Sequence, residues 1–153
     1  MHPNNPALEY PYPEAPDIIR RKFGAQKVMK LFNTRLERIE PGLIEIGMDL
    51  QTSLTQQDGY LHAGVVTTLL DSACGFAALS MMPAGSRVLS VEFKVNLMAP
   101  ANGQRFLARG EVIKSGRTLT VCRGELLSFM EDTPSTAALM QATMMRLSGK
   151  PTG

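Results

Sequence analysis

Apolar and polar positions alternate with different periods in successive parts of the chain. Residues 17–32 carry apolar side chains at helical spacing, and Asp17 stands at the expected N-cap, so a helix is predicted there. From Thr34 to Leu50 short alternating runs flank the sequence Glu40-Pro41-Gly42, which predicts two strands joined by a turn. Five prolines in residues 1–16 exclude a continuous helix or sheet ladder, and an N-terminal arm is expected.

Residues 63–82 form an apolar stretch long enough to span a membrane. Polar or flexible residues interrupt it, namely Gly64, Thr67, Thr68, Asp71, Ser72 and Gly75, and this favours a buried core helix. The helix is expected to stop at Met82-Pro83-Ala84-Gly85. Because it is rich in small residues and apolar nearly all round, a second copy of the chain is expected to cover part of it.

The remaining chain is predicted to form four strands, at residues 88–98, 106–113, 118–129 and 136–147. In the first of them, Val91, Phe93, Val95 and Leu97 alternate, and residues 114–117 form a hairpin turn. Consecutive hairpin-linked strands make an antiparallel sheet. One sheet and one long helix predict an α+β fold in which the sheet wraps the helix. The expected organisation is an arm at 1–16, one domain at 17–147 and a tail at 148–153.

Composition and charge narrow the classes of partner. Apolar residues make up 44% of the 153 residues and charged residues 20%, with a net charge of +2, as in ordinary globular proteins. There is no long run of Lys or Arg, so neither nucleic acid nor a membrane is expected as a partner. The N-terminus does not resemble a secretory signal, and Cys74 and Cys122 are expected to be reduced core residues, which favours the cytoplasm. His2 and His62 are not at metal-ligand spacing, and neither a metal nor a cofactor is expected.

The candidate chemistry lies in residues 56–71. Asp71 is the single charged side chain between Ala63 and Met82, and a lone buried carboxylate is costly unless it is hydrogen-bonded or has a function. The first turn of a helix presents free N–H groups and a positive dipole end, so the N–H of Ala63 or Gly64 can polarise a carbonyl. Asp71 can then act as a nucleophile or as a general base.

The spacing of these groups adds a constraint. Residues 63 and 71 lie eight positions apart on one helix, which corresponds to about 12 Å. Both cannot reach one carbonyl within a single chain. If both act, Asp71 comes from a second subunit whose helix runs antiparallel, and the site lies across a two-fold interface.

The same residues carry a resemblance to a known family. The segment Gly59-Tyr60-Leu61-His62-Ala63-Gly64 resembles the G-x-x-H-G-G motif of hotdog-fold acyl-CoA thioesterases, specifically the phenylacetate-pathway, PaaI-like branch. Asp71 stands at that family's spacing for its catalytic carboxylate, and residues 90–100 with the turn Gly116-Arg117 are similar to its later strands. The resemblance spans roughly residues 34–147 and rests on these three matches.

The resemblance implies a hotdog fold, a homodimer or dimer of dimers, and hydrolysis of an acyl-CoA to the acid and coenzyme A without a cofactor. It implies that the N–H groups of Ala63 and Gly64 hold the thioester carbonyl and that His62 and Gln56 orient the groups of the site. It also implies that Asp71 acts from the partner chain. Two positions depart from the family's pattern. Ala63 replaces a glycine and keeps its N–H, but its methyl group narrows the approach, and Gly75 lacks a hydroxyl found in some relatives.

Each candidate also has a purely structural interpretation. Asp71 can be a buried acid bonded to Thr67 or Thr68, and His62 can be a helix-entry residue that bonds local backbone. Gln56 can be an exposed loop residue, and Gly64 can serve close helix packing.

Substrate contacts are predicted on two kinds of side chain. Lys114 and Arg117, in the hairpin turn, are candidates for the coenzyme A phosphates, although each can be a solvated cation. Met81, Met82 and Met98 are candidates for an adaptable acyl pocket, although methionine also fills cores.

Two other functions fit the same pattern. A non-catalytic acyl-CoA- or lipid-binding hotdog module results if Ala63 spoils the carbonyl geometry. A hotdog dehydratase is disfavoured because the His-Phe-Pro signature of one branch is missing. The sequence does not determine which acyl group the substrate carries.

Overall fold

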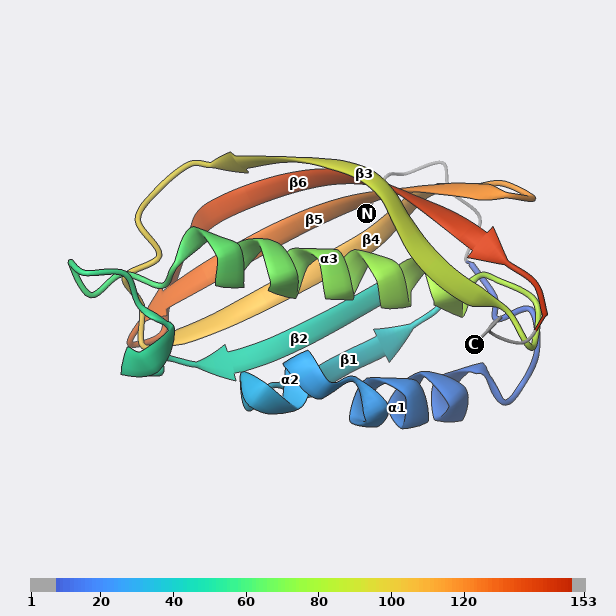
Figure 1. Ribbon diagram of the computed structural model, residues 1–153, viewed down its shortest axis with the longest axis horizontal. Coiled ribbons are helices and arrows are strands. Elements are labelled where there is room, and N and C mark those ends of the chain that lie inside the picture. The colour runs from blue at the N-terminus through green and yellow to red at the C-terminus, as the bar shows by residue number, and fades with distance from the viewer. Residues whose placement is uncertain (1–7, 150–153) are drawn as a thin grey trace.

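The computed structural model describes residues 8–149 and contains one curved antiparallel sheet that wraps a long helix, α3 (Ala63–Ser80) (Figure 1). The sheet comprises β1 (Arg35–Glu40), β2 (Leu43–Asp49), β3 (Arg87–Leu97), β4 (Arg105–Ser115), β5 (Leu119–Met130) and β6 (Thr133–Leu147). Its spatial order is β1-β2-β4-β5-β6-β3, so β3 forms one edge beside β6. The predicted α+β arrangement is confirmed.

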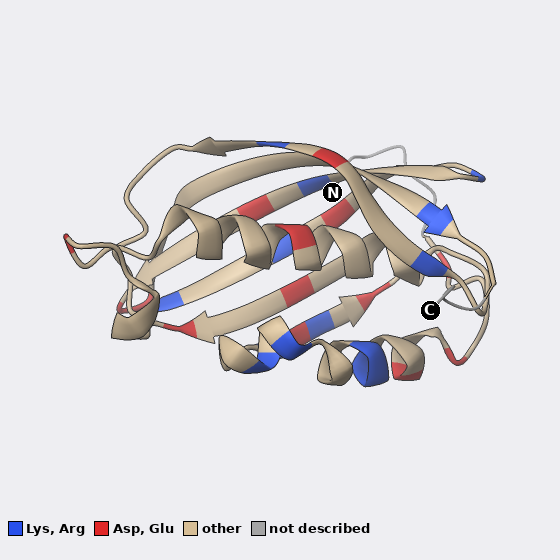
Figure 2. Ribbon diagram, in the orientation of Figure 1, with Lys and Arg blue, Asp and Glu red and all other residues tan. Residues whose placement is uncertain are grey.

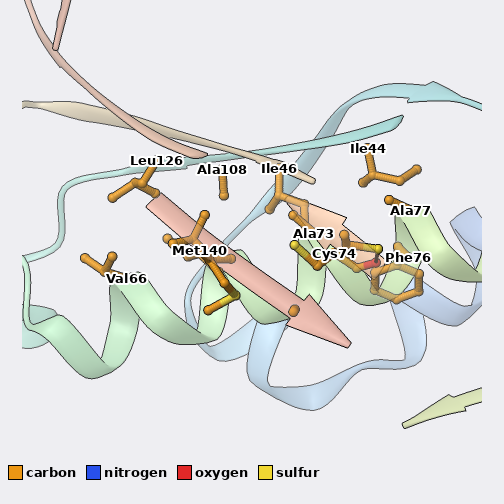
Figure 3. Close-up of a cluster of buried hydrophobic side chains, with 14 of the residues drawn as sticks. Ile44, Ile46, Val66, Ala73, Cys74, Phe76, Ala77, Ala108, Leu126 and Met140 are labelled. Atoms are coloured by element: carbon orange, nitrogen blue, oxygen red, sulfur yellow. Dashed lines mark hydrogen bonds between the residues drawn. The ribbon is translucent and has the colours of Figure 1, made fainter. Parts of the chain in front are cut away.

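The helix α3 is held in the sheet by its apolar side chains. It is long and apolar enough to cross a membrane, with a mean hydropathy of 1.4, but 67% of it is buried inside the protein. Figure 3 shows Val66, Ala73, Cys74, Phe76 and Ala77 of this helix packed among side chains of the surrounding strands. The interpretation of residues 63–82 as a core helix is therefore confirmed.

Two paired glycines let α3 approach the sheet closely. Gly110 of β4 is the register partner of Gly124 of β5. A Cβ at Gly110 would lie only 2.3 Å from the backbone carbon of Ala73, and one at Gly124 would lie 3.2 Å from the Cys74 sulfur. A side chain at Gly110 would thus push the helix off the sheet, because backbone cannot move aside as a flexible side chain can.

The N-terminal region differs from the predicted single helix over 17–32. It forms α1 (Ala15–Ala25) and α2 (Lys27–Leu31), because Gln26 between them has an extended ψ of 107°. The helix α1 begins before Asp17, which lies in the first turn, so the prediction of Asp17 as N-cap is wrong. Residues 1–7 of the expected arm and 150–153 of the expected tail lie outside the described residues.

All six predicted strands are present. The strands β4 and β6 are longer than the pattern indicated, whereas β3 and β5 are each shifted by one residue. The expected loop at 131–134 is a tighter hairpin, since β5 reaches Met130 and β6 begins at Thr133. A short 3-10 helix, η1 (Thr52–Leu54), precedes the loop that leads into α3.

Two β-bulges change which residues face α3. In β3 the register steps from Ser90 opposite Met144 to Glu92 opposite Thr143, so Val91 is an extra residue. In β6 the register steps from Ala138 opposite Leu126 to Thr136 opposite Leu127, so Ala137 is extra. Each bulge reverses the alternation of side chains along its strand.

Candidate functional site

The N-terminal end of α3 presents one unused backbone donor. His62 is the N-cap, and its Nδ1 accepts a hydrogen bond of 2.9 Å from the Gly64 N–H. The N–H groups of Val65 and Val66 donate to the His62 carbonyl at 2.9 and 3.1 Å. Within residues 8–149 no acceptor bonds the Ala63 N–H, which therefore remains available for a ligand oxygen.

These contacts bear on two of the predicted residues. The interpretation of His62 as a helix-entry residue that bonds local backbone is confirmed. Because Nδ1 accepts, a neutral His62 carries its proton on Nε2. The Gly64 N–H is occupied by this cap, which leaves Ala63 as the stronger candidate for holding a carbonyl.

One stripe of α3 is not covered by the sheet. The helix residues that are not fully buried are Ala63, Gly64, Thr67, Thr68, Asp71 and Gly75. Their three- and four-residue spacing places them on a single face. The candidate carbonyl donor and the candidate carboxylate thus lie on the same open face of one helix, eight residues apart.

Asp71 is half-buried and is the only charged residue of α3, visible as the single red band on that helix (Figure 2). Its Oδ1 accepts a hydrogen bond of 2.5 Å from the Ser90 hydroxyl of β3. Thr67 and Thr68 instead donate to the carbonyls of Ala63 and Gly64. The structural interpretation of Asp71 as bonded to these threonines is therefore wrong, and Ser90 is its partner.

A cavity of about 370 Å³ opens beside the start of α3. It is lined by Gln56 and Tyr60 from the preceding loop, by Leu61, Ala63 and Val66, by residues 97–101, and by Ala137 of β6. Apolar surface predominates in this lining, and Ala63 belongs both to the cavity and to the helix entrance. Of the predicted catalytic residues, the structure brings Gln56 and Ala63 here, and of the predicted substrate contacts it brings Met98.

The Gln56 side chain is held by its own loop. Its Nε2 donates to the Asp58 carboxylate at 3.3 Å, and its Oε1 accepts from the Asp58 N–H. Gln56 is half-buried at the cavity wall, so its amide is fixed where a substrate atom can reach it.

The other predicted substrate contacts lie at the opposite end of α3. Met82 is only 3% exposed and belongs to the core, while Met81 lies near Gly42 at the start of β2. Lys114 and Arg117 are exposed in the β4–β5 hairpin. Within one chain the structure thus separates these four residues from the cavity at the start of α3.

Neither cysteine is a candidate nucleophile. Cys74 and Cys122 are free and completely buried, as predicted for reduced core residues. Burial raises the pKa of the Cys122 thiol to about 12 and the pKa of Cys74 further, with the nearby Cys122 and Asp71 adding to the effect at Cys74. Both thiols are therefore uncharged near neutral pH. Residues 8–149 contain no group of three or more His, Cys, Asp or Glu side chains that could hold a metal ion.

Comparison with known proteins identifies the family. Residues 58–132 match the Thioesterase superfamily. The crystal structure of a thioesterase family protein from Silicibacter pomeroyi is 46% identical, covers 88% of this chain and 99% of that chain, and superimposes with a TM-score of 0.87. This chain therefore belongs to the thioesterase superfamily and has the hotdog fold.

Two further proteins are similar at lower identity. The medium/long-chain acyl-CoA thioesterase YigI from Salmonella typhimurium is 24% identical over 106 residues, which is 60% of this chain and 68% of that protein. The PaaI protein from the phenylacetic acid degradation operon of E. coli is 17% identical, covers 90% of this chain and 96% of that chain, and has a TM-score of 0.81. At this identity the likeness to PaaI shows the shared fold.

Sequence reasoning missed two residues near the site. Ser90 lies out of phase with the alternating Val91, Phe93, Val95 and Leu97, so the pattern gives no sign that it reaches α3. Ala137 has no chemical signal in the sequence. The positions of both side chains depend on the bulges in β3 and β6. Neither bulge contains a glycine or proline that would indicate it in the sequence.

Proposed function

We propose that this protein is an acyl-CoA thioesterase of the PaaI-like type that works as a homodimer in the cytoplasm. The superfamily membership supports thioester hydrolysis, and the similarity to YigI, a medium/long-chain acyl-CoA thioesterase, supports a coenzyme A ester as the substrate. The observation that carries the proposal is the open stripe of α3, which holds an unused N–H at Ala63 and a carboxylate at Asp71. The free thiols suit a reducing compartment.

The open surface supports a dimer. The edge strand β3 exposes large apolar side chains beyond its bulge, with Phe93 43% and Leu97 55% exposed. Beside it runs the stripe of α3, whose small residues allow a second helix to approach closely. A copy related by a two-fold axis near Thr67 would set Asp71 of the partner subunit opposite Ala63. Burying this apolar surface stabilises the pair.

In that arrangement the groups divide the reaction between two chains. The Ala63 N–H, at the positive end of the α3 dipole, donates to the thioester oxygen and stabilises its negative charge as the carbonyl carbon is attacked. The carboxylate of Asp71 takes a proton from the attacking water, or attacks the carbon itself to give an anhydride that water then opens. The carbon–sulfur bond breaks, and the coenzyme A thiolate leaves and is protonated.

Ser90 and Gln56 have supporting roles in this proposal. The Ser90 hydroxyl holds Oδ1 of Asp71, and no residue among those described bonds Oδ2, which is left for water or substrate. Gln56 orients the carbonyl from the cavity wall. Lys114 and Arg117 remain the predicted contacts of the coenzyme A phosphates. An antiparallel partner would bring its own β4–β5 hairpin toward the start of the first chain's α3.

The test is release of free thiol from a panel of acyl-CoAs by the wild type and by Asp71→Asn. We expect the wild type to release coenzyme A and Asp71→Asn to lose at least about 100-fold in kcat, because the amide can neither accept the proton nor attack. The melting temperature and the oligomeric state of both proteins should agree. Full turnover by Asp71→Asn would contradict the assigned role.

Binding experiments separate the alternative function. If the wild type binds acyl-CoAs tightly by calorimetry but releases no thiol, the protein is the non-catalytic acyl-CoA- or lipid-binding module. Thiol release by the wild type but not by Asp71→Asn supports the enzymatic function.

A further inference from the structure

The cavity at the start of α3 contains no charged side chain. Its lining consists of Gln56, Tyr60 and otherwise apolar residues, and its volume of about 370 Å³ lies within the range of about 300–1,000 Å³ typical of small-molecule sites. A carboxylate buried there would have no cation to pair with. In the proposed dimer it would also lie near the partner subunit's Asp71, whose charge has the same sign. The cavity therefore favours an uncharged, apolar occupant.

The bulge in β6 contributes Ala137 to the lining of this cavity. Ala137 and Ala138 are consecutive, yet they are only 1% and 0% exposed, whereas neighbouring strand residues normally face opposite sides. The carbonyl of Ala137 accepts hydrogen bonds from both Met98 and Ala99, at 2.8 and 3.2 Å. These bonds fix the segment after β3 against the bulge. Both alanines belong to the buried core, and Ala137 also lines the cavity.

We infer that Ala137 sets the size of the acyl group that this site accepts, and that the acyl group is neutral and apolar. This inference rests on the proposed function. The cavity adjoins the Ala63 N–H, so a carbonyl held there points its acyl chain toward Ala137 and Met98. The methyl group of Ala137 leaves space that a larger side chain would fill. Acyl groups with a terminal carboxylate are poor substrates.

The test measures kcat/KM for straight-chain acyl-CoAs from acetyl to dodecanoyl, with glutaryl-CoA as the charged probe. In the wild type we expect kcat/KM to rise with chain length, by roughly tenfold for a methylene that is fully buried, and glutaryl-CoA to react at least about 100-fold more slowly than pentanoyl-CoA. Ala137→Leu should lower kcat/KM for octanoyl-CoA more than tenfold and leave acetyl-CoA within about twofold.

Two further variants make the result independent of misfolding. Met98 is 59% exposed, so Met98→Ala should fold normally and should selectively weaken turnover of the longer chains. Ala84→Leu adds the same bulk on an exposed turn at the far end of α3 and should leave the chain-length profile unchanged. Melting curves are recorded for all three variants.

The outcomes distinguish the inference from the proposed function. A uniform loss over all chain lengths in Ala137→Leu and Met98→Ala would mean that the cavity holds the pantetheine arm, and it would overturn the inference. So would equal turnover of glutaryl- and pentanoyl-CoA. If the wild type hydrolyses none of these acyl-CoAs, the proposed function fails. Dissociation constants for the same acyl-CoAs then test the inference about Ala137 by itself. A ratio of octanoyl to acetyl affinity that Ala137→Leu lowers supports the inference, and an unchanged ratio overturns it.

Discussion

Ala63 stands at the first position of α3, where its N–H has no acceptor among the described residues. The same position tolerates proline in most helices, because the missing donor would be unpaired anyway. His62 before it has φ −61° and ψ 137°, the extended conformation that a residue before proline prefers. A single substitution can therefore remove the proposed carbonyl donor without disturbing the helix.

We predict that Ala63→Pro lowers kcat by about 100- to 1,000-fold, the usual cost of losing one oxyanion donor. The control is Ala63→Ser, which keeps the N–H and should stay active. Steady-state thiol release and circular dichroism measure the two effects. Comparable activity in both variants would mean that the Ala63 N–H is not used.

Ser90 is a positioning residue, because it acts on the reaction through Asp71. Ser90→Ala removes the hydrogen bond to Oδ1, and we expect kcat to fall by roughly tenfold or more, as for a hydrogen bond to a charged group. Because the hydroxyl acts through Asp71, its loss should leave KM for the acyl-CoA within about twofold of the wild type. Ser90→Thr should restore kcat. Steady-state thiol release measures both constants, and an unchanged kcat in Ser90→Ala would contradict the positioning role.

At the scale of single elements, the pairing of α3 with the sheet depends on Gly110. A Cβ there would meet the backbone of Ala73 at 2.3 Å. We predict that Gly110→Ala lowers the free energy of unfolding by about 3 kcal/mol or more. Gly24→Ala is the matched control, since a Cβ at Gly24 in α1 meets nothing within 4 Å and should stabilise the helix by up to about 1 kcal/mol. Urea denaturation compares the two, and equal stabilities would contradict the packing argument.

The two β-bulges also decide which side chains of their strands face the site. They reverse the alternation along β3 and β6, so that Ser90 and not Val91 reaches α3 and Ala137 reaches the cavity. Period-two patterns in the sequence predict a regular strand and cannot show where an extra residue enters.

At the scale of the whole molecule, the proposed site needs two chains. The distance of about 12 Å between the levels of Ala63 and Asp71 on α3 prevents both from acting on one carbonyl in one subunit. This leads to a complementation experiment with the two inactive variants, Asp71→Asn and Ala63→Pro.

We predict that a heterodimer of these variants regains about half of the wild-type activity. One of its two sites combines an unaltered Ala63 with an unaltered Asp71, and the other site carries both changes. Co-expression with two different affinity tags isolates the heterodimer, and thiol release is compared with both homodimers. A heterodimer as inactive as its parents would place each site within a single chain.

The sequence by itself determined the element types, the core helix and the region of the candidate chemistry. Periodicity predicted all six strands, and the lone charge of Asp71 with His62 at the helix entry marked the same helix that the structure contains. These features are local, because they depend on spacing along the chain. Only the tertiary structure decided that Ser90 bonds Asp71, that the Gly64 N–H is taken by His62, that Met98 and Ala137 meet in one cavity, and that Met81 and Met82 lie at the other end. Strand register, bulges and the packing of α3 set those contacts, and they join residues far apart in sequence.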